Sequence, residues 1–570
     1  MTAYDYVIIG AGTSGCVLAN RLSADPKVSV CVLEAGPSDR FELIHTPGAL
    51  GALFFIKRYD WSFKAKPDPA IRKGEPLFCA RGKTLGGSSS INGMVYSRGQ
   101  PADYDHWAEL GNPGWSFEDV LPYFRKLESN VRGASPYHGA DGPMTVSDCE
   151  FQFPISKVFV DAARQTGLPI TDDLSAPPYE GVGPYQHTIA NGRRCSTADG
   201  YLHPVMSRSN LTVKTGAYVV SIDFDGKRAV GVSYESGEHR TSIKARREVI
   251  VSAGSYNSPQ LLMLSGVGDP DELKANGIKL VHSLPGVGKN LMEHPAVFLQ
   301  NSSHAHDGVQ LSLVGLLEMM GQGIEYYGAN AGKLRASVVE SGGYLKTDPA
   351  LPRPNIHLMF EPMLFDFASQ NIQTMREHGY SCHIAALSPK SRGTVGLASA
   401  DPSHSPVIDF KLLSHPDDVK TLVEGVRLVR RIFAAPAFEK YRKEEVYPGV
   451  DTQSDEALGH AIRDRGSFAE HAAGTCKMGT DDMAVVDAQL RVRGLEGLRI
   501  VDASIMPTLA NGNIYCPVIM IGEKAADIIL GAQPLPPERG RPHYFAILAR
   551  QHHDRKYIDA EDPKRQGGRI

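Results

Sequence analysis

The sequence predicts an α/β protein that begins with a strand–helix–strand unit. The apolar run Tyr4–Ile9 predicts a buried strand, Gly15–Leu22 a helix, and Val28–Leu33 a second strand. Segments with strand character return far downstream, between residues 211 and 251 and again near residue 498. These observations indicate a sheet covered by helices, with further sheet segments much later in the chain.

A glycine-rich motif, Gly10-x-Gly12-x-x-Gly15, joins the first strand to the helix. Gly10 allows the tight turn, Gly12 lets the backbone approach a pyrophosphate, and Gly15 lets the helix sit close to the strand. The N–H groups at the start of the helix, at Thr13 and Ser14, face the same phosphates. Glu34, followed by Ala35, ends the second strand, where a carboxylate can bind ribose hydroxyls. The unit is therefore predicted to be Rossmann-like and to bind a dinucleotide.

Size and composition narrow the class of protein. A chain of 570 residues exceeds what one hydrophobic core usually supports, so two or more packed domains are expected. A net charge of −4 gives no support for binding nucleic acid. The eight cysteines are scattered without a CxxC pair, which argues against a zinc site or a redox dithiol and favours separate reduced thiols.

The sequence favours a cytoplasmic location. The first strand begins within about five residues of Met1, which leaves no room for a signal peptide. No apolar run reaches the ~18–20 residues that a membrane-spanning helix needs. The closest, Val309–Tyr327, is interrupted by glycines and acidic residues. It is predicted either as a helix of a second domain, which we favour, or as a lid or membrane-docking helix.

Further elements follow from local pattern. Tyr104–Leu127 is predicted to be helical with a break at Gly111–Gly114, and Asp417–Phe433 to be a helix. Pro517–Leu530 is predicted as a helix with Glu523 and Lys524 on its polar side. The predicted later strands are Leu211–Lys214, Tyr218–Ile222, Val230–Tyr234, Glu248–Val251, Ile356–Phe360 and Leu498–Asp502.

The first glycine motif does not by itself distinguish NAD from FAD. Two more glycine- and serine-rich stretches help to make that distinction. Arg81–Tyr96 contains Gly86, Gly87 and Gly93, and small residues there would let backbone approach a flat ring and a phosphate. The second stretch is Ser252–Gly268.

Both stretches resemble the two signature motifs of the glucose-methanol-choline (GMC) flavin oxidoreductases, and the resemblance extends from about Asp5 to Leu530. Lys390–Gly393 and Val339–Gly343 look closest to bacterial choline- and aliphatic-alcohol-dehydrogenase-like members. The resemblance implies an α/β (α+β overall) architecture: a Rossmann-like FAD-binding domain assembled from discontinuous segments and a substrate domain with an antiparallel sheet and helices. The implied FAD-binding segments are 1–150, 196–294 and 466–532, the substrate-domain segments are 151–195 and 295–465, and 533–570 is a C-terminal extension, either partly disordered or a surface strap.

The resemblance also assigns cofactor contacts. Val219 would hold the adenine through its backbone, Asp502 and Ala503 would contact the ribityl or pyrophosphate region, and Trp61 would either abut the cofactor or pack as a core aromatic. The other residues implied are Arg81, Gly86, Gly87, Asn92, Gly93, Met94, Val95, Ala253, Gly254, Tyr515 and Pro517. Where choline-oxidase-like members carry a histidine bonded to the flavin, this chain has Ile91, which has no nucleophile. Non-covalent FAD is therefore expected.

A histidine and an asparagine near the C-terminus match the family's catalytic pair. Loss of an alcohol's hydroxyl proton requires a base poised near neutral pH, a task that suits His471. Asn513 could hydrogen-bond the substrate oxygen without competing for its proton. His294 is predicted to be structural or near the flavin. Many relatives have Tyr-His-Pro where this chain has Glu470-His471-Ala472, and an asparagine where it has Tyr515. These differences leave the catalytic pair intact but alter its surroundings, so the pair does not predict the substrate.

The function implied is FAD-dependent oxidation of a primary alcohol to the aldehyde, with electrons passed to quinone, a dye or another acceptor. Phe468, Ile514 and Tyr515 suggest an aliphatic or aromatic substrate body. The alternatives are choline, for whose cation Glu470 is a candidate partner, and an oxidase that uses O2. A GMC-fold lyase and a flavin-binding structural protein are the less favoured alternatives. The oligomeric state is left open.

Overall fold

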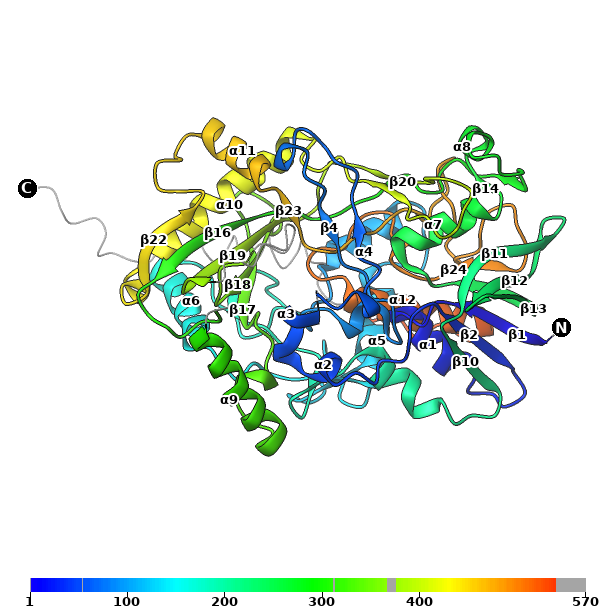
Figure 1. Ribbon diagram of the computed structural model, residues 1–570, viewed down its shortest axis with the longest axis horizontal. Coiled ribbons are helices and arrows are strands. Elements are labelled where there is room, and N and C mark those ends of the chain that lie inside the picture. Colours follow the sequence, from blue (N-terminus) through cyan, green and yellow to red (C-terminus); the bar gives the residue numbers. More distant parts are fainter. Residues whose placement is uncertain (1, 54, 311–312, 366–375, 540–570) are drawn as a thin grey trace, which may run out of the picture.

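The computed structural model describes residues 2–53, 55–310, 313–365 and 376–539. Two seven-stranded sheets lie at opposite ends of the elongated molecule, each with its own helices (Figure 1). Residues from both ends meet in the centre, where the catalytic pair predicted from the sequence lies. The six domain ranges above stay a prediction, and residues 540–570 of the C-terminal extension lie outside the described residues.

The first sheet is Rossmann-like and is built from three separated parts of the chain. Its order is β10-β2-β1-β13-β12-β11, with β24 paired to β13. The β10, β2, β1, β13 and β24 strands are parallel, whereas β11 and β12 add an antiparallel edge. The bounds are β1 Ala3–Ile9, β2 Val30–Glu34, β10 Leu211–Thr215, β11 Tyr218–Asp225, β12 Arg228–Ser236, β13 His239–Val251 and β24 Leu498–Ile500. The sequence placed each of these strands but started β13 too late, because the first part of this strand is largely exposed and charged and lacks an apolar run.

Three helices cover the nucleotide end of this sheet. α1 (Thr13–Leu22) packs closely against α12 (Tyr515–Leu530): a Cβ added to Gly522 would lie 3.0 Å from Val17 Cβ. α5 (Phe117–Leu127) packs on the outer side of α12. The predicted break in Tyr104–Leu127 is confirmed, since α4 (Pro101–Glu109) ends before it.

The prediction that Glu523 and Lys524 lie on a polar face of α12 is wrong. Both side chains are buried. Arg21 and Lys126 form ion pairs with Glu523, and the ammonium of Lys524 lies over the rings of Trp115 and Tyr123. The helix buries three charged side chains, with Asp527 as the third, and their partners come largely from α1 and α5, which a pattern within one helix cannot show.

The second sheet is antiparallel throughout and has the order β22-β16-β19-β18-β17-β7, with β23 paired to β16. The bounds are β7 Gly181–Pro184, β16 Pro295–Ser303, β17 Ser341–Leu345, β18 Ile356–Glu361, β19 Gly379–Ala386, β22 Arg442–Tyr447 and β23 Ser467–Phe468. α6 (Pro154–Gln165) and α10 (Pro416–Ala434) cover one face, where Gly425 packs against Ile384 and Ile356. The other face looks into the centre of the molecule.

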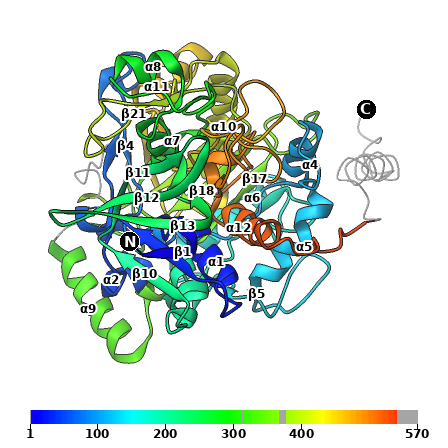
Figure 2. The same ribbon diagram turned by 90° about the vertical axis from the view of Figure 1, so that its right-hand side faces the viewer.

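α9 (Leu313–Ala329) projects from the body of the protein beside this sheet (Figures 1 and 2). It contains most of the predicted segment Val309–Tyr327, of which residues 311 and 312 lie outside the described residues. Met320, Ile324 and Tyr327 are exposed on it. None of the described helices is long and apolar enough to cross a membrane. The two interpretations of this segment remain predictions.

The remaining helices and strands lie outside the two large sheets and their main covering helices. Their bounds are α2 Glu42–His45, α3 Leu50–Leu53, β3 Phe63–Lys64, β4 Phe78–Cys79, β5 Glu128–Asn130, β6 Met144–Val146, β8 Ile189–Ala190, β9 Arg193–Arg194, α7 Gly254–Leu264, β14 Val267–Gly268, α8 Pro270–Ala275, β15 His282–Ser283, β20 Thr394–Gly396, β21 Val407–Asp409 and α11 Asp455–Asp464.

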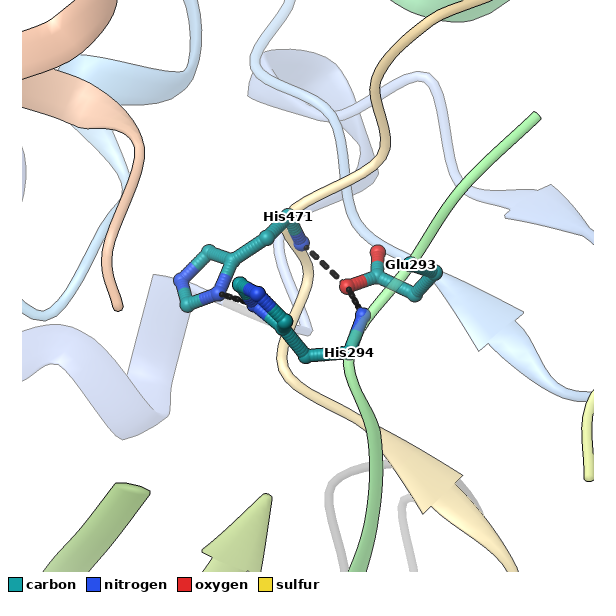
Figure 3. A group of neighbouring side chains, drawn as sticks. All are labelled: Glu293, His294 and His471. Carbon is teal, nitrogen blue, oxygen red and sulfur yellow. Dashed lines mark hydrogen bonds between the residues drawn. The ribbon is translucent and has the colours of Figure 1, made fainter. Parts of the chain in front are cut away.

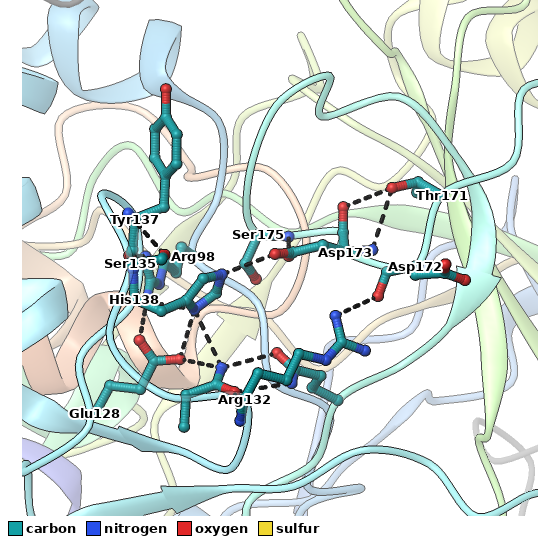
Figure 4. Close-up of polar contacts among 12 residues, drawn as sticks. Arg98, Glu128, Arg132, Ser135, Tyr137, His138, Thr171, Asp172, Asp173 and Ser175 are labelled. Atoms are coloured by element: carbon teal, nitrogen blue, oxygen red, sulfur yellow. Dashed lines mark hydrogen bonds and ion pairs between the residues drawn. The ribbon is translucent and has the colours of Figure 1, made fainter.

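A polar network ties the segment before α4 to β5, to the loop between β5 and β6, and to the segment before β7 (Figure 4). Glu128 forms an ion pair with Arg98 and accepts a hydrogen bond from His138 Nδ1 at 2.9 Å. The other ring nitrogen, Nε2, donates to Asp173 at 2.8 Å. Burial opposes the charge on His138, but the hydrogen bonds to Asp173 and Glu128 outweigh it and raise the pKa of the imidazole.

Candidate active site

A cavity of about 1690 Å³ lies between the two sheets. Its walls come from the glycine-rich turn before α1, from the Arg81–Tyr96 stretch, from the inner face of the antiparallel sheet, and from the segment containing His471. A second hollow of about 630 Å³ continues from it along the carboxyl ends of β1 and β2, and the two share Gly12, Trp61 and Ala253. The whole is an elongated space that can take an extended ligand.

The turn before α1 is shaped to receive phosphate. Gly12 is the residue before the helix and gives it no side-chain cap, so the first N–H groups of α1 are left for a ligand. A Cβ on Gly12 would meet nothing closer than 3.9 Å and would stand in the open space of the cavity. Gly10 has φ +95°, and its Cβ would lie 2.5 Å from Ser252 O. The turn therefore needs glycine for its conformation and for a close ligand approach.

Glu34 lies at the end of β2, on the wall of the smaller hollow. Its two carboxylate oxygens accept hydrogen bonds from Ala11 N at 2.9 Å and from Gly36 N at 2.8 Å. Burial raises the pKa of this carboxyl to about 7 against the opposing effect of the two N–H groups. Fixed in this way, the carboxylate keeps lone pairs free for ribose hydroxyls, as the sequence predicts.

The second glycine-rich stretch packs directly on the first. A Cβ on Gly87 would lie 2.7 Å from Gly12 Cα, so backbone touches backbone here. Arg194, which sequence reasoning missed, supports this stretch from behind. Its guanidinium donates to Asn92 O and Asn92 Oδ1, both at 2.7 Å, and burial lowers its pKa to about 10. The dipeptide Arg193-Arg194 belongs to no recognisable motif, so the sequence did not indicate this role of Arg194.

Asp502 follows β24 and fixes the third side of the cavity. It accepts hydrogen bonds from Gly254 N at 2.9 Å, from Ser258 Oγ at 2.6 Å and from Ser504 N at 2.8 Å. These bonds align the start of α7 beside the start of α1. Trp61 packs as an aromatic, since its ring stacks on Phe63, and it also lines both hollows. Its predicted contact with the cofactor stays a prediction.

The structure brings most of the predicted site residues together around this space. The predicted residues that line it are Gly10, Gly12, Thr13, Ser14, Glu34, Ala35, Trp61, Arg81, Gly87, Asn92, Gly93, Met94, Val95, Val219, Ala253, Gly254, His471, Asp502, Ala503, Asn513 and Tyr515. Gly15, Gly86 and Pro517 lie outside the lining. Gly15 has its role in packing, because its Cβ would lie 2.0 Å from Gly10 O.

His471 and Asn513 face one another across the cavity floor. Asn513 Nδ2 donates to His471 Nε2 at 3.1 Å, so Nε2 is the unprotonated ring nitrogen. The proton then resides on Nδ1, which donates to His294 Nδ1 at 3.0 Å (Figure 3). Burial lowers the pKa of His471 well below its ordinary value, and the neighbouring His294 lowers it further. The ring is therefore neutral at pH 7, and its Nε2 lone pair is directed at Asn513 on the cavity wall.

Glu293 holds the backbone of the two histidines together. Its Oε1 accepts from the N–H groups of His294 and His471, both at 2.8 Å (Figure 3). Burial raises the pKa of Glu293 to about 8 despite the nearby Arg81. His294, predicted to be structural or near the flavin, thus contacts the catalytic candidate itself. The pattern Glu293-His294 offered no sign of this contact, because it is made across 177 residues.

Glu470, the residue that departs from the family pattern, is engaged by a cation. Arg81 donates to its Oε2 at 2.6 Å, and the same guanidinium lies 3.9 Å from Glu293. Glu470 also accepts from Ala80 N at 3.2 Å and has φ +63°, a backbone conformation uncommon for such a residue. This carboxylate is thus committed to holding the segment that carries His471.

These features fit FAD. The turn at Gly12 would offer N–H groups to a pyrophosphate, Glu34 would face a ribose in the smaller hollow, and Gly87, Gly93 and Met94 line the larger hollow together with His471. The elongated shape of the joined hollows matches a dinucleotide with its flavin end at the catalytic pair.

Two family models match the chain, both described as GMC oxidoreductase, over residues 4–296 and 389–522. The chain belongs to the GMC oxidoreductase family. An alcohol dehydrogenase [acceptor] of Pseudomonas putida is 45% identical over 534 residues, which cover 92% of this chain and 96% of that protein. An oxygen-dependent choline dehydrogenase of Brucella ovis is 43% identical and covers 93% and 96%.

Solved GMC structures share the fold. Pyridoxine 4-oxidase from Mesorbium loti matches with a TM-score of 0.84 and 29% identity, covering 93% of this chain and all of that one. Formate oxidase of Aspergillus oryzae, in a study of its FAD modification, matches with a TM-score of 0.85 and 28% identity over 93% and 98%. The GMC protein described here is thus an FAD-dependent oxidoreductase that acts on CH–OH groups, with a small-molecule alcohol as substrate and an electron acceptor.

Proposed function

We propose that the protein oxidises a primary alcohol to the aldehyde with His471 as the base. One observation carries the proposal. The Nε2 lone pair of a buried, neutral imidazole lies at the cavity, where it accepts a hydrogen bond from Asn513 Nδ2. A substrate hydroxyl that takes the place of this amide donor gives its proton to Nε2 as the carbinol C–H bond breaks. Asn513 Nδ2 then donates to the substrate oxygen and orients it.

The remaining polar groups keep this base in place. The bond from Nδ1 to His294 fixes the tautomer, so that the nitrogen facing the substrate is the one able to accept a proton. Glu293 and Arg81 hold the backbone on either side. FAD, when bound, supplies the acceptor for the hydride. Proton and hydride leave the same carbinol group, and the products are the aldehyde and the reduced cofactor.

We propose that FAD is bound non-covalently. Ile91 lines the cavity where a nucleophile would be needed for a bond to the flavin, and its hydrocarbon side chain cannot form one.

The cavity supports an aliphatic or aromatic substrate body. Phe298, Met359 and Phe468 line it, and Val339 and Ile514 add further apolar surface. The alcohol dehydrogenase and choline dehydrogenase relatives support an aliphatic alcohol as the first candidate and choline as the second. Glu470 is a poor partner for choline because Arg81 already neutralises it. The acceptor is proposed to be a quinone or a comparable molecule, with O2 as the alternative.

Anaerobic reduction of the flavin tests the proposal. Primary alcohols of increasing chain length are mixed with the holoenzyme without oxygen, and the loss of the oxidised flavin absorbance is followed. We expect bleaching by at least one primary alcohol and reoxidation when a quinone, a dye or O2 is added. An enzyme that converts cyanohydrins while its flavin stays oxidised would instead be a lyase and would contradict the proposal.

A further inference from the structure

Glu361 is a buried carboxylate in the substrate part of the cavity. It is the last residue of β18, its exposure is 3%, and it lines the same space as His471. No described residue donates a hydrogen bond to its carboxylate, and Oε2 is buried without a partner. An uncompensated buried carboxyl is costly, so a ligand that supplies the missing donor would relieve it.

The other carboxylates on the cavity wall already have partners. Asp502 accepts three hydrogen bonds, Glu34 accepts two from the backbone, and Glu470 is paired with Arg81. The guanidinium of Arg81 is therefore engaged by Glu470 and does not serve as the partner of Glu361. Burial raises the pKa of Glu361 to about 8, and no cation among the described residues opposes this rise. Among the described carboxylates that line the cavity, Glu361 is the one that accepts no hydrogen bond from a described residue.

The sheet register places Glu361 away from the catalytic histidine. β18 and β19 pair Met359 with His383 and Glu361 with Ser381. Alternate residues of a strand share a face, so Glu361 lies on the same cavity-facing side as Met359. It is two residues, ~7 Å, further along the strand than the paired Met359 and His383. The polar neighbours in its own row are engaged elsewhere, since Ser381 Oγ donates to Met363 O at 2.6 Å.

The wall between the two ends is apolar. Phe298, Met359 and Phe468 line it, and the Phe298 ring stacks on His383 with a centroid distance of 4.4 Å. A substrate whose hydroxyl reaches His471 would lay a carbon chain along this wall and bring its far end toward Glu361.

We propose that Glu361 is a specificity-determining residue that receives a protonated amine at the far end of the alcohol substrate. The proposal rests on the proposed function, because it assumes that the hydroxyl end reaches His471. An ammonium with N–H bonds supplies both the hydrogen-bond donors and the positive charge that this carboxylate lacks. A terminal hydroxyl supplies a donor without the charge, and a quaternary ammonium supplies the charge without a donor. The substrate class is thus an amino alcohol with several carbon atoms between its two polar groups.

Matched substrates and two variants test this assignment. The substrates share one chain length: a 1-alkanol, the α,ω-diol, the ω-amino-1-alkanol and its N-trimethyl form. The wild type is expected to show a kcat/KM for the amino alcohol at least ~10-fold above that for the alkanol. E361L, an apolar replacement of similar size, should lose this preference through KM, so that kcat/KM for the amino alcohol falls to that for the alkanol. E361Q, which keeps the shape, should lose the advantage of the amine but keep activity on the diol.

A binding measurement separates this proposal from the proposed function. An n-alkylammonium ion, which has no hydroxyl to oxidise, is titrated calorimetrically into the wild-type holoenzyme and into E361L. Weakening of its binding on the order of 10–100-fold in E361L is expected. This result would support the amine subsite even if no alcohol reduced the flavin, in which case the proposed function alone would fail.

The thermal stability of E361L and the substrate preference of the wild type can each contradict the amine subsite. E361L should have a thermal midpoint at or above that of the wild type, because an unpaired buried carboxyl is removed. A lower midpoint would show that Glu361 has a structural role instead. An equal kcat/KM for the alkanol and the amino alcohol in the wild type, a preference for the diol or the N-trimethyl form, or unchanged alkylammonium binding in E361L would each overturn the amine subsite.

Discussion

At the scale of single residues, the imidazole of His471 owes its chemistry to its hydrogen bonds. The amide of Asn513 on Nε2 and the ring of His294 on Nδ1 select one tautomer, and burial keeps it neutral. The sequence could propose His471 and Asn513 as the catalytic pair because they sit in long motifs that resemble those of the family. His294, Arg194 and Glu361 could not be proposed in this way, because their roles depend on partners or empty space brought to them by distant strands.

Ile91 leads to a prediction about the flavin linkage. Acid precipitation of the holoenzyme should release all of the yellow colour into the supernatant, because no nucleophile at this position can bond the flavin. The absorbance of supernatant and pellet checks it, with a serum albumin and FAD mixture as the recovery control. Colour retained in the washed pellet would show a covalent bond and contradict the assignment.

At the scale of elements, the sequence predicted the parallel strands of the first sheet and the helices around it most accurately. These elements are continuous apolar runs bounded by glycine motifs, so their local pattern is strong. Of the antiparallel sheet, the sequence predicted β18 but missed β16, β17 and β19, which are buried along all or nearly all of their length and show no alternation. The charges on α12 were misplaced for a related reason, as their partners come from other helices.

The network around β5 should make stability depend on pH. The pKa of His138 is raised, so its contribution is present below its unfolded pKa and is lost as pH rises through the folded value. Burial tends to raise the pKa values of Glu128 and Asp173, but Arg98 and His138 lower them overall, so their contribution is lost as pH falls. From the ordinary values of 4.5 and 6.5, the network should stabilise most between about pH 4.5 and 6.5.

His138→Gln tests this network. We expect the thermal midpoint of the variant to fall below that of the wild type at pH 6 and to approach it at pH 9. The control is His106→Gln, whose partner Glu109 and own side chain are both exposed and should matter little. An equal loss at pH 6 and pH 9 would mean that packing, not the charge on His138, holds these segments together.

At the scale of the whole molecule, the site exists because two sheets face each other. The first sheet carries the turn and the carboxylate proposed to hold the phosphates and the ribose, and the inner face of the second sheet lines the proposed substrate space. The segment from β23 to β24 carries His471 between them: Pro295 pairs with Phe468 in one sheet, and Val249 with Leu498 in the other. The reaction class depends on the cofactor space, the substrate space and His471 coming together between the two sheets. The choice of substrate depends on wall residues, among which we propose Glu361.

The most direct test of the central claim is the rate of anaerobic flavin reduction in His471→Ala. The variant, the wild type and His460→Ala, which alters an exposed histidine on α11, are compared at equal FAD content with a saturating primary alcohol. The account predicts a reduction rate about 10²–10⁴-fold lower in His471→Ala, the range expected for loss of a general base, and an unchanged rate in His460→Ala. A His471→Ala enzyme that retains FAD and reduces it at the wild-type rate would contradict the account.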